Sequence, residues 1–370
     1  MNVKIPVSHR LPVKALIAWY AANGRDLPWR RSRAIYRIWI SEVMLQQTRS
    51  DTVVPFYRRF LKRFPSLPAL AKADFQEVLK SWEGLGYYSR ARNLHLAARA
   101  VISEYGGVIP TTEADFGRLA GVGPYITAAV LSIACGQPLP AVDGNVLRVF
   151  SRFFGSGRDI GRTATRKWIR RRLQDVIPEN QPGDFNQALM ELGARICLPR
   201  RPQCPVCPLR RRCVARVAGW TGKLPHRRRR KPVPLYHVAL AVLVRGGRFF
   251  IQRRSPSGHL AGMWEFPGGK ARRGEAMEQA LRRELREELG IEVVVLDQLA
   301  AVRHAYSHFA VRLHVFVCRP GSGRMHCLRP HRWIGLDEIS AYPFPAANHK
   351  IFAILRQDSA FDKGGRLCYT

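Results

Sequence analysis

LAGVGPYITAAV, residues 119–130, places two glycines and a proline directly before a helical run of small and apolar residues. Glycines let backbone amides approach a ligand closely, and the N-terminus of the helix adds positive potential. Gly121 and Gly123 are therefore candidates to hold a phosphate, because such a hairpin grips a DNA backbone without reading its sequence. A G-x-G-P turn is also a common connector between helices. The neighbouring segments therefore have to show whether this turn binds phosphate or only joins two helices.

The segments on both sides of this hairpin carry helical periodicity. From about Leu11 to Ala218, apolar residues recur at spacings of three and four, and glycine or proline marks the breaks. After a Pro- and Arg-rich stretch, the pattern changes to strand-like runs with one clear helix, EAMEQALRRELREEL. We expect a multidomain chain: an all-α domain at 1–219, a basic linker at 220–235, an α+β domain at 236–357 and a basic tail at 358–370.

The charge balance points to a polyanionic partner. The chain has 61 Lys and Arg against 27 Asp and Glu, a formal net charge of +34. Nucleic acid is the first expected partner of such a positive field, and a membrane surface or a generally basic composition of the host's proteins are the alternatives. No run approaches the roughly 18 apolar residues of a membrane span, and Lys14 and Arg25 interrupt any secretory pattern. We expect a cytoplasmic, nucleoid-associated, monomeric protein with no membrane partner and with reduced thiols.

Four of the eight cysteines are crowded within one short segment. Their spacing is C-x6-C-x2-C-x5-C, so four thiolates can close around one site that holds Zn²⁺ or an iron–sulfur cluster. The spacing alone does not separate these metals. Arginines interleave with the cysteines, which favours a metal-stapled basic loop that presses on phosphates. The four candidate ligands are Cys197, Cys204, Cys207 and Cys213.

Two carboxylates lie where local patterns favour either chemistry or a structural role. Glu42 stands among apolar residues in RIWISEVMLQQT, so it either faces solvent or lies in a poorly hydrated pocket. In such a pocket, desolvation raises the pKa of a carboxyl group and keeps it protonated as a general acid. Asp143 precedes the helical run GNVLRVFSRFF, where capping of the helix is the structural alternative.

Seven ordered motifs resemble the adenine DNA glycosylase (MutY) family and extend over nearly all of the first domain. HAYSHF at 304–309 continues the resemblance into the second domain. The first-domain motifs are LPWR at 27–30, SEVMLQQT at 41–48, GLGYYSRARNLH at 84–95, GVGPY at 121–125, AVDGNV at 141–146, FNQALMELGARIC at 185–197 and the cysteine spacing.

The resemblance implies a helix–hairpin–helix DNA glycosylase domain with a [4Fe-4S] loop, followed by a Nudix-like domain. Its expected partner is double-stranded DNA that contains adenine opposite 8-oxoguanine or guanine. Glu42 matches the acid that protonates adenine at N7, and the same residue is a candidate to activate the incoming water. Asp143 matches the residue that stabilises the oxocarbenium-like sugar, either electrostatically or through a transient covalent adduct. Asn145 matches an orienting residue, and Tyr125 matches a residue that lines the pocket.

The resemblance also implies the residues that contact DNA while the adenine is extruded. Three of them, Gln47, Thr48 and Tyr88, match residues that wedge into the gap. Leu85, Gly86 and Tyr87 belong to the same DNA-facing turn. Trp29, Arg30 and Gln187 match residues around the extruded adenine.

Tyr125 also implies the type of glycosylase. The related endonuclease III carries a lysine directly after its G-V-G-x turn, where the amine forms a Schiff base. This chain has Tyr125 at that position. Because a nucleophilic amine is missing, the resemblance predicts excision of the base without strand cleavage.

Residues 236–357 resemble the Nudix-like domain with which this family recognises 8-oxoguanine. Ser307 is expected to hydrogen-bond the oxidised base, and Tyr306 or His308 to buttress or intercalate. A strand-end loop without functional contacts is the structural alternative.

Residues 269–291 also fit the full pattern of Nudix hydrolases, G-x5-E-x7-R-E-U-x-E-E-x-G-U, which many adenine glycosylases have lost. One hypothesis keeps this segment as a scaffold of Arg–Glu pairs. The other is Mg²⁺-dependent hydrolysis of an oxidised nucleoside triphosphate, with Glu284, Glu287 and Glu288 as ligands. Rival functions for the whole chain are a Nudix pyrophosphohydrolase tethered to DNA and a non-catalytic mismatch-binding protein.

Overall fold

The computed structural model describes residues 10–228 and 232–357, so the expected tail at 358–370 lies outside the described residues. The chain packs as two compact units. The first comprises the described parts of Met1–Lys72 and Asn93–Arg230, and the second comprises Ala73–Arg92 and the described parts of Lys231–Thr370. A helical segment from the first half of the sequence therefore belongs to the second unit.

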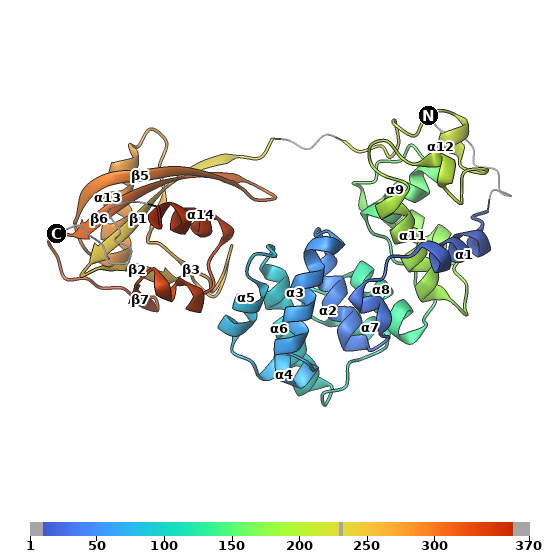
Figure 1. The fold of residues 1–370 in the computed structure, drawn as a ribbon, viewed down its shortest axis with the longest axis horizontal. Coiled ribbons are helices and arrows are strands. Elements are labelled where there is room, and N and C mark those ends of the chain that lie inside the picture. Colours follow the sequence, from blue (N-terminus) through green and yellow to red (C-terminus); the bar gives the residue numbers. More distant parts are fainter. Residues whose placement is uncertain (1–9, 229–231, 358–370) are drawn as a thin grey trace. The chain divides into compact units, whose positions relative to one another are not determined.

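The first unit is all-α, as predicted, and consists of helices joined by short turns (Figure 1). Its elements are α1 (Val13–Asn23), η1 (Pro28–Arg31), α2 (Ile35–Leu45), α3 (Ser50–Arg63), α4 (Leu67–Lys72), most of α6 (Ser89–Glu104), α7 (Glu113–Arg118), α8 (Pro124–Cys135), α9 (Gly144–Phe153), α10 (Thr163–Gln174), α11 (Pro182–Arg195), η2 (Cys204–Val206) and α12 (Val214–Val217). Within the described ranges, no helix is both long and apolar enough to span a bilayer.

The hairpin at 119–124 leads into helix α8, whose two ends are set by a proline and a glycine. Pro124 occupies the first turn of α8, where its missing N–H costs nothing, and Gly136 ends the helix in the left-handed region with φ 69°. Gly121 has φ +76°, and a side chain there would lie 2.7 Å from the Asn93 Cβ atom. Only glycine fits this turn, which leads directly into the helix that carries Tyr125.

Helices α9 and α11 approach each other closely because one residue between them lacks a side chain. A Cβ atom added to Gly193 would lie 2.5 Å from Cβ and 3.0 Å from Cα of Asn145. This close packing holds the start of α9, where Asp143 and Asn145 lie, against α11.

The second unit is built on a mixed sheet in which the central strands have the order β3-β2-β1-β6-β5, while β4 pairs with β1 and β7 with β2. β1 and β6 run parallel, and the other pairs are antiparallel. Its elements are α5 (Phe75–Trp82), β1 (Leu235–Arg245), β2 (Arg248–Arg253), β3 (Trp264–Glu265), β4 (Gly268–Lys270), α13 (Met277–Leu289), β5 (Val293–Ala305), β6 (Ala310–Pro320), β7 (His331–Ile334), η3 (Asp337–Ala341) and α14 (Ala346–Leu355).

Residues 239–244 of strand β1 are buried on both faces, which explains the continuous apolar sequence of this part of the strand. Leu240, Val242 and Val244 belong to one core with Phe352 of α14. Their neighbours along the strand, such as Ala241, belong to a second core with α13. Helices α14 and α13 therefore cover opposite faces of the sheet (Figure 1). The α+β prediction for this part of the chain is confirmed.

Candidate active site

Glu42 lies on α2 and is 4% exposed, so the structure selects the poorly hydrated pocket over the solvent-facing alternative. Burial, aided by the nearby Asp143 and opposed by Tyr125 and Arg30, raises the pKa of Glu42 to about 7. A carboxyl group with this pKa keeps its proton in a large fraction of molecules at neutral pH. It therefore has the property that a general acid needs.

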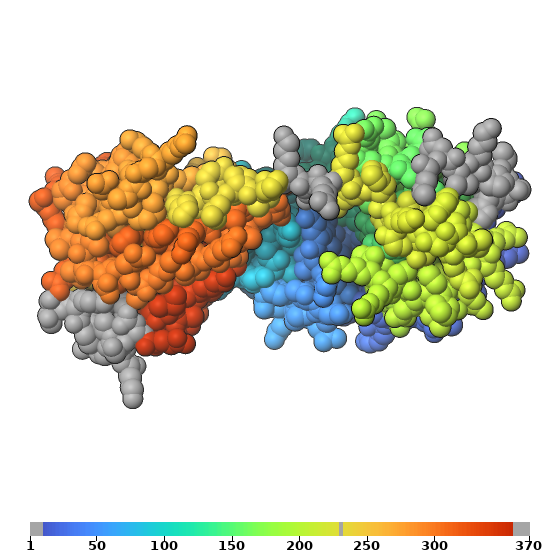
Figure 2. All heavy atoms as spheres, turned by 90° about the horizontal axis from the view of Figure 1, so that it is seen from above, coloured from blue at the N-terminus to red at the C-terminus, as the bar shows by residue number. Residues whose placement is uncertain are grey.

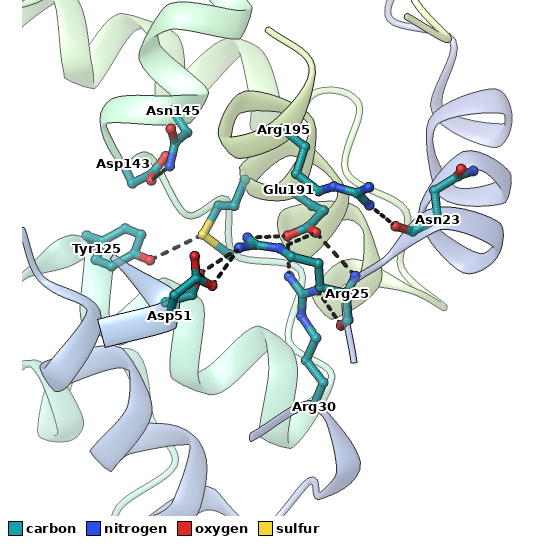
Figure 3. A network of polar contacts seen from close by, with 11 residues as sticks. Asn23, Arg25, Arg30, Asp51, Tyr125, Asp143, Asn145, Glu191 and Arg195 are labelled. Carbon is teal, nitrogen blue, oxygen red and sulfur yellow. Dashed lines mark hydrogen bonds and ion pairs between the residues drawn. The ribbon is translucent and has the colours of Figure 1, made fainter. Parts of the chain in front are cut away.

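The Tyr125 hydroxyl donates a hydrogen bond of 2.7 Å to Oε2 of Glu42. It also lies 3.2 Å from Sδ of Met190 on α11, the yellow sulfur atom that a dashed line joins to Tyr125 in Figure 3. Burial raises the pKa of Tyr125 well above its ordinary value, and the carboxylates of Glu42 and Asp143 raise it further. The phenol therefore keeps its proton and acts as a donor. It fixes the orientation of one Glu42 oxygen.

Asp143 caps helix α9 with one carboxylate oxygen and contacts Asn145 with the other. Its Oδ1 atom accepts a hydrogen bond of 2.7 Å from the Val146 amide, which caps α9, and its Oδ2 atom accepts 2.8 Å from Nδ2 of Asn145 (Figure 3). The Asn145 Oδ1 atom accepts in turn from Arg148, whose guanidinium also donates 2.7 Å to the carbonyl of Cys197. Burial raises the pKa of Asp143, while these hydrogen bonds and Arg148 lower it.

A buried ion-pair network beside this centre was missed by the sequence reasoning. Glu191 on α11 has a side chain that is 1% exposed, and it pairs with Arg25 at 2.7 Å and with Arg30 at 2.9 Å (Figure 3). Although burial raises the pKa of Glu191, the hydrogen bonds and charges of the two arginines lower it to about 2. The sequence offered a signal for Glu191, because this acid stands among apolar residues in FNQALMELGARIC. The same pattern had singled out Glu42.

The remaining residues expected around the extruded adenine are placed as follows. Arg30 also donates 3.0 Å to the carbonyl of Arg25. Trp29 is buried, and its ring meets that of Tyr57 edge-on at 5.4 Å. Gln187 on α11 is half-buried.

The proposed wedge residues differ in exposure. Gln47 is exposed, has a left-handed backbone with φ 58°, and is followed by the half-buried Thr48. Tyr87 is 42% exposed and has φ 49°. A left-handed conformation at a non-glycine residue is strained and is concentrated at functional sites.

Tyr88, for which the resemblance implies a wedge role, is buried in this structure. It is 7% exposed, and its hydroxyl accepts a hydrogen bond from the Gly84 amide. Leu85 of the same turn is also buried, whereas Gly86 is half-buried with φ 77°. In this structure Tyr87 therefore presents the exposed ring of the turn, and the wedge role of Tyr88 stays a prediction.

The four cysteines lie in the segment drawn in yellow-green on the surface of the first unit in Figure 2. Burial, aided by the other three cysteines, raises the pKa of Cys207 to about 12. Nη1 of Arg152 lies 3.4 Å from Sγ of Cys197. Among the described residues, no three Cys, His or carboxylate side chains are as close as a single metal ion requires. The interleaved arginines Arg200, Arg201, Arg210, Arg211 and Arg212 are exposed.

The Nudix box of α13 consists of carboxylates that pair with arginines. Arg283 donates 2.8 Å to Glu275, 2.7 Å to Glu284 and 3.3 Å to Glu287. Glu288 pairs with Arg329 at 3.0 Å and also accepts 2.8 Å from Gln252. No metal-holding group is found here either, within the part of the chain that the structure describes.

The loop between β5 and β6 carries the expected reader of the oxidised base. Tyr306 is half-buried against His259, with ring centroids 4.6 Å apart, so it buttresses the loop. His308 is exposed. Ser307 donates a hydrogen bond of 3.1 Å to the Tyr87 hydroxyl, which belongs to the same unit.

The comparisons with known proteins agree with this geometry. Residues 40–179 match the HhH-GPD superfamily of base excision DNA repair proteins, and residues 238–353 match the NUDIX domain. The human adenine DNA glycosylase is 34% identical over 92% of this chain and 73% of its own length. The chain belongs to the adenine DNA glycosylase family. The adenine DNA glycosylase of Buchnera aphidicola from Acyrthosiphon pisum is 29% identical over 82% of this chain and 85% of its own length.

The helical unit of this adenine DNA glycosylase also has a solved relative. A thermostable thymine-DNA glycosylase covers 56% of this chain and 95% of its own, with 31% identity and a TM-score of 0.52. The chain is thus a base-excision repair N-glycosylase with a helix–hairpin–helix domain and a Nudix domain, and DNA is its partner.

Proposed function

We propose that this adenine DNA glycosylase removes adenine opposite 8-oxoguanine or guanine, with Glu42 as the general acid. The buried Glu42 carboxyl group, with its pKa near 7 and its hydrogen bond from Tyr125, carries the proposal. Glu42→Gln removes the transferable proton and should abolish excision while binding of the mispair persists. Near-normal single-turnover excision by Glu42→Gln would overturn the assignment.

In the proposed reaction, Glu42 transfers its proton to N7 of adenine, so the base departs as a neutral group. The sugar then carries oxocarbenium-like charge, which the Asp143 carboxylate stabilises. Both Asp143 oxygens accept hydrogen bonds, from Val146 and Asn145, as an ionised group does. The ionised Glu42 then receives a proton from the incoming water.

The absence of an amine at position 125 supports base removal without strand cleavage. Tyr125 offers a phenol that stays protonated and already donates to Glu42. No Schiff base can form there. Borohydride should therefore trap little covalent protein–DNA adduct, and efficient trapping would contradict the proposal.

We further propose that Ser307 recognises 8-oxoguanine in the opposite strand. Its half-buried hydroxyl lies in a loop that the Tyr306 and His259 rings support. Ser307→Ala should lower the preference for 8-oxoguanine over guanine. An unchanged ratio of excision rates would argue against this reader.

Exposed Gln47 and Tyr87 are proposed to contact the DNA around the extruded base, and the hairpin at Gly121 and Gly123 to hold a phosphate. Both side chains sit on a strained backbone that projects them outward. Tyr87→Ala should weaken binding of the mispair. Tyr88→Ala should lower stability instead, because its ring is buried.

The donor set of the cysteine loop fits a [4Fe-4S] cluster, which would cross-link this surface segment when bound. Four thiols interact electrostatically in one loop, and the Arg152 and Arg148 guanidiniums beside Cys197 suit an anionic thiolate centre. Cys197, Cys204, Cys207 and Cys213 would hold the cluster. Iron and sulfide analysis of the purified enzyme should give about four of each per chain, and a stoichiometric zinc content would contradict this.

For the Nudix box, the arginine pairs favour the scaffold over hydrolysis. Arg283 bridges Glu275, Glu284 and Glu287, and Arg329 reaches Glu288. Glu284 packs directly over Gly269, and a Cβ atom at that position would lie 2.1 Å from Glu284 Oε2, so a side chain there would displace this carboxylate. The full enzyme with Mg²⁺ and an oxidised nucleoside triphosphate should release no pyrophosphate.

A further inference from the structure

Helix α5 docks on the Nudix domain along one regular face, although nearly all of the rest of the helical half belongs to the first unit. The hydrogen bonds to the Nudix domain come from Gln76 and Lys80 on the helix, from Glu83 at its C-terminal cap and from Tyr87 in the following turn, at spacings of four, three and four residues. This spacing places the first three on one side of a helix, and the fourth follows in the turn. We call these four residues the α5 stripe.

The hydrogen bonds of Gln76 fix the orientation of its side-chain amide. The Gln76 amide donates 2.9 Å to the carbonyl of Gly262 and accepts 2.9 Å from Nε1 of Trp264. An indole N–H only donates and a carbonyl only accepts, so the amide has one orientation. Gly262 has φ +78°, and a side chain there would lie 3.2 Å from the Phe75 ring. The helix thus sits tightly against the loop that precedes β3.

Glu83 is the centre of the docking contact. Its Oε1 atom accepts 2.8 Å from the Phe344 amide and 3.0 Å from Nε2 of His349, while Oε2 accepts 2.5 Å from Nζ of Lys80. Lys80 also donates 3.0 Å to the carbonyl of Tyr342. The Glu83 side chain is 13% exposed, so these hydrogen bonds replace most of its hydration.

The turn at residues 84–88 follows Glu83 directly and is braced from within. The Trp82 indole donates 3.1 Å to the carbonyl of Gly86, and Arg90 donates 3.0 Å to the same carbonyl. The Gly84 amide donates 3.2 Å to the Tyr88 hydroxyl. Because the turn is tied to the end of α5, the position of the Tyr87 hydroxyl beside Ser307 depends on where α5 docks.

We propose that Glu83 is a positioning residue for discrimination of the opposite base, which acts by fixing the 84–88 turn to the loop that carries Ser307. The inference rests on the proposed role of Ser307 as reader. Tyr87 gives the Ser307 hydroxyl a partner at 3.1 Å, and so orients it before DNA arrives. The Ser307 hydroxyl and the exposed Tyr87 ring therefore act together, and Glu83 keeps them in contact.

The test compares single-turnover excision of adenine opposite 8-oxoguanine and opposite guanine in full-length variants. Glu83→Ala should lower the ratio of the two rates about tenfold, as coupling between contacting groups allows. Glu83→Gln keeps an acceptor for the Phe344 amide and should lose less. His349→Ala removes one contact from the Nudix side, leaves α5 intact and should also lower the ratio.

Glu83→Ala in a Ser307→Ala background should lower the ratio no further, because both act through one hydroxyl. Glu104→Gln, a change of an exposed glutamate at the end of α6, serves as the charge-matched control and should leave the ratio unchanged. A Ser307→Ala effect without a Glu83→Ala or His349→Ala effect would overturn this inference alone, and so would additivity in the double variant. An unchanged ratio in Ser307→Ala would instead overturn the proposed reader, and this inference with it.

Discussion

At Glu42, one neighbouring hydroxyl affects how readily the carboxyl group releases its proton. The Tyr125 hydrogen bond lowers the pKa of Glu42, which burial has raised to about 7. Excision should therefore fall as pH rises above 7, because only protonated Glu42 can donate. In Tyr125→Phe the lost hydrogen-bond donor should raise the pKa of Glu42, so the falling limb of the pH–rate profile should move to higher pH by about one unit. Single-turnover rates between pH 5 and 9 measure the limb, and movement to lower pH would contradict the assignment.

Glu191 shows the opposite perturbation and carries a prediction about stability. Glu191→Ala leaves Arg25 and Arg30 without their buried partner, and should cost about 3–5 kcal/mol of unfolding free energy. Urea unfolding at pH 7 measures the loss. Asp26→Ala breaks the Arg31 pair, in which both side chains are largely exposed, and is the matched control with little expected effect.

The same ion pair should weaken in acid. The pKa of Glu191 is lowered to about 2 from an ordinary 4.5, so its contribution is fully present above pH 4.5. It is lost as pH falls from 4.5 towards 2. The difference between wild type and Glu191→Ala should therefore shrink across this window, and a constant difference would show that the carboxylate charge is unimportant.

At the scale of elements, the approach of α9 to α11 depends on Gly193. Gly193→Ala would place a methyl group against Asn145 and should cost about 1–3 kcal/mol by overpacking. It should also slow excision, because Asn145 orients Asp143. Gly117→Ala is the control: its nearest neighbour would lie at an ordinary 3.6 Å, within helix α7. That change should be neutral or stabilising by up to about 1 kcal/mol. Thermal unfolding and excision rates distinguish the two.

Helices and strands were predictable from sequence where the apolar residues follow a regular local spacing. The long strands and α13 carried apolar runs or a helical period, so they were found, whereas β3, with two residues, offers too little pattern to detect. Glu42 remained ambiguous because its burial depends on packing by distant helices. Tyr87 and Tyr88 could not be ranked, since the positive φ that turns Tyr87 outward is set by the fold.

At the scale of the whole molecule, the formal charge of +34 predicts salt-sensitive binding to duplex DNA. Each lost phosphate contact should reduce the slope of log K against log salt by about 0.9. The double change Arg211→Ala with Arg212→Ala, in the exposed cysteine loop, should reduce the slope by up to about 1.8. Arg273→Ala with Arg324→Ala removes equal charge from exposed sites in the second unit. If both pairs change the slope equally, the loop has no special contact with phosphates.

Packing of α5 on the Nudix domain also has a consequence for synthesis of the chain. Gln76 and its partner Trp264 are 188 residues apart in sequence. At about 5–20 residues per second, a ribosome needs roughly 10–40 seconds to make the partner after Gln76 has been added. The glycosylase helices on either side of α5 emerge before that. During this interval the α5 stripe of the nascent protein lacks its hydrogen-bond partners from the Nudix domain. A premature stop codon after the helical half would remove these partners permanently.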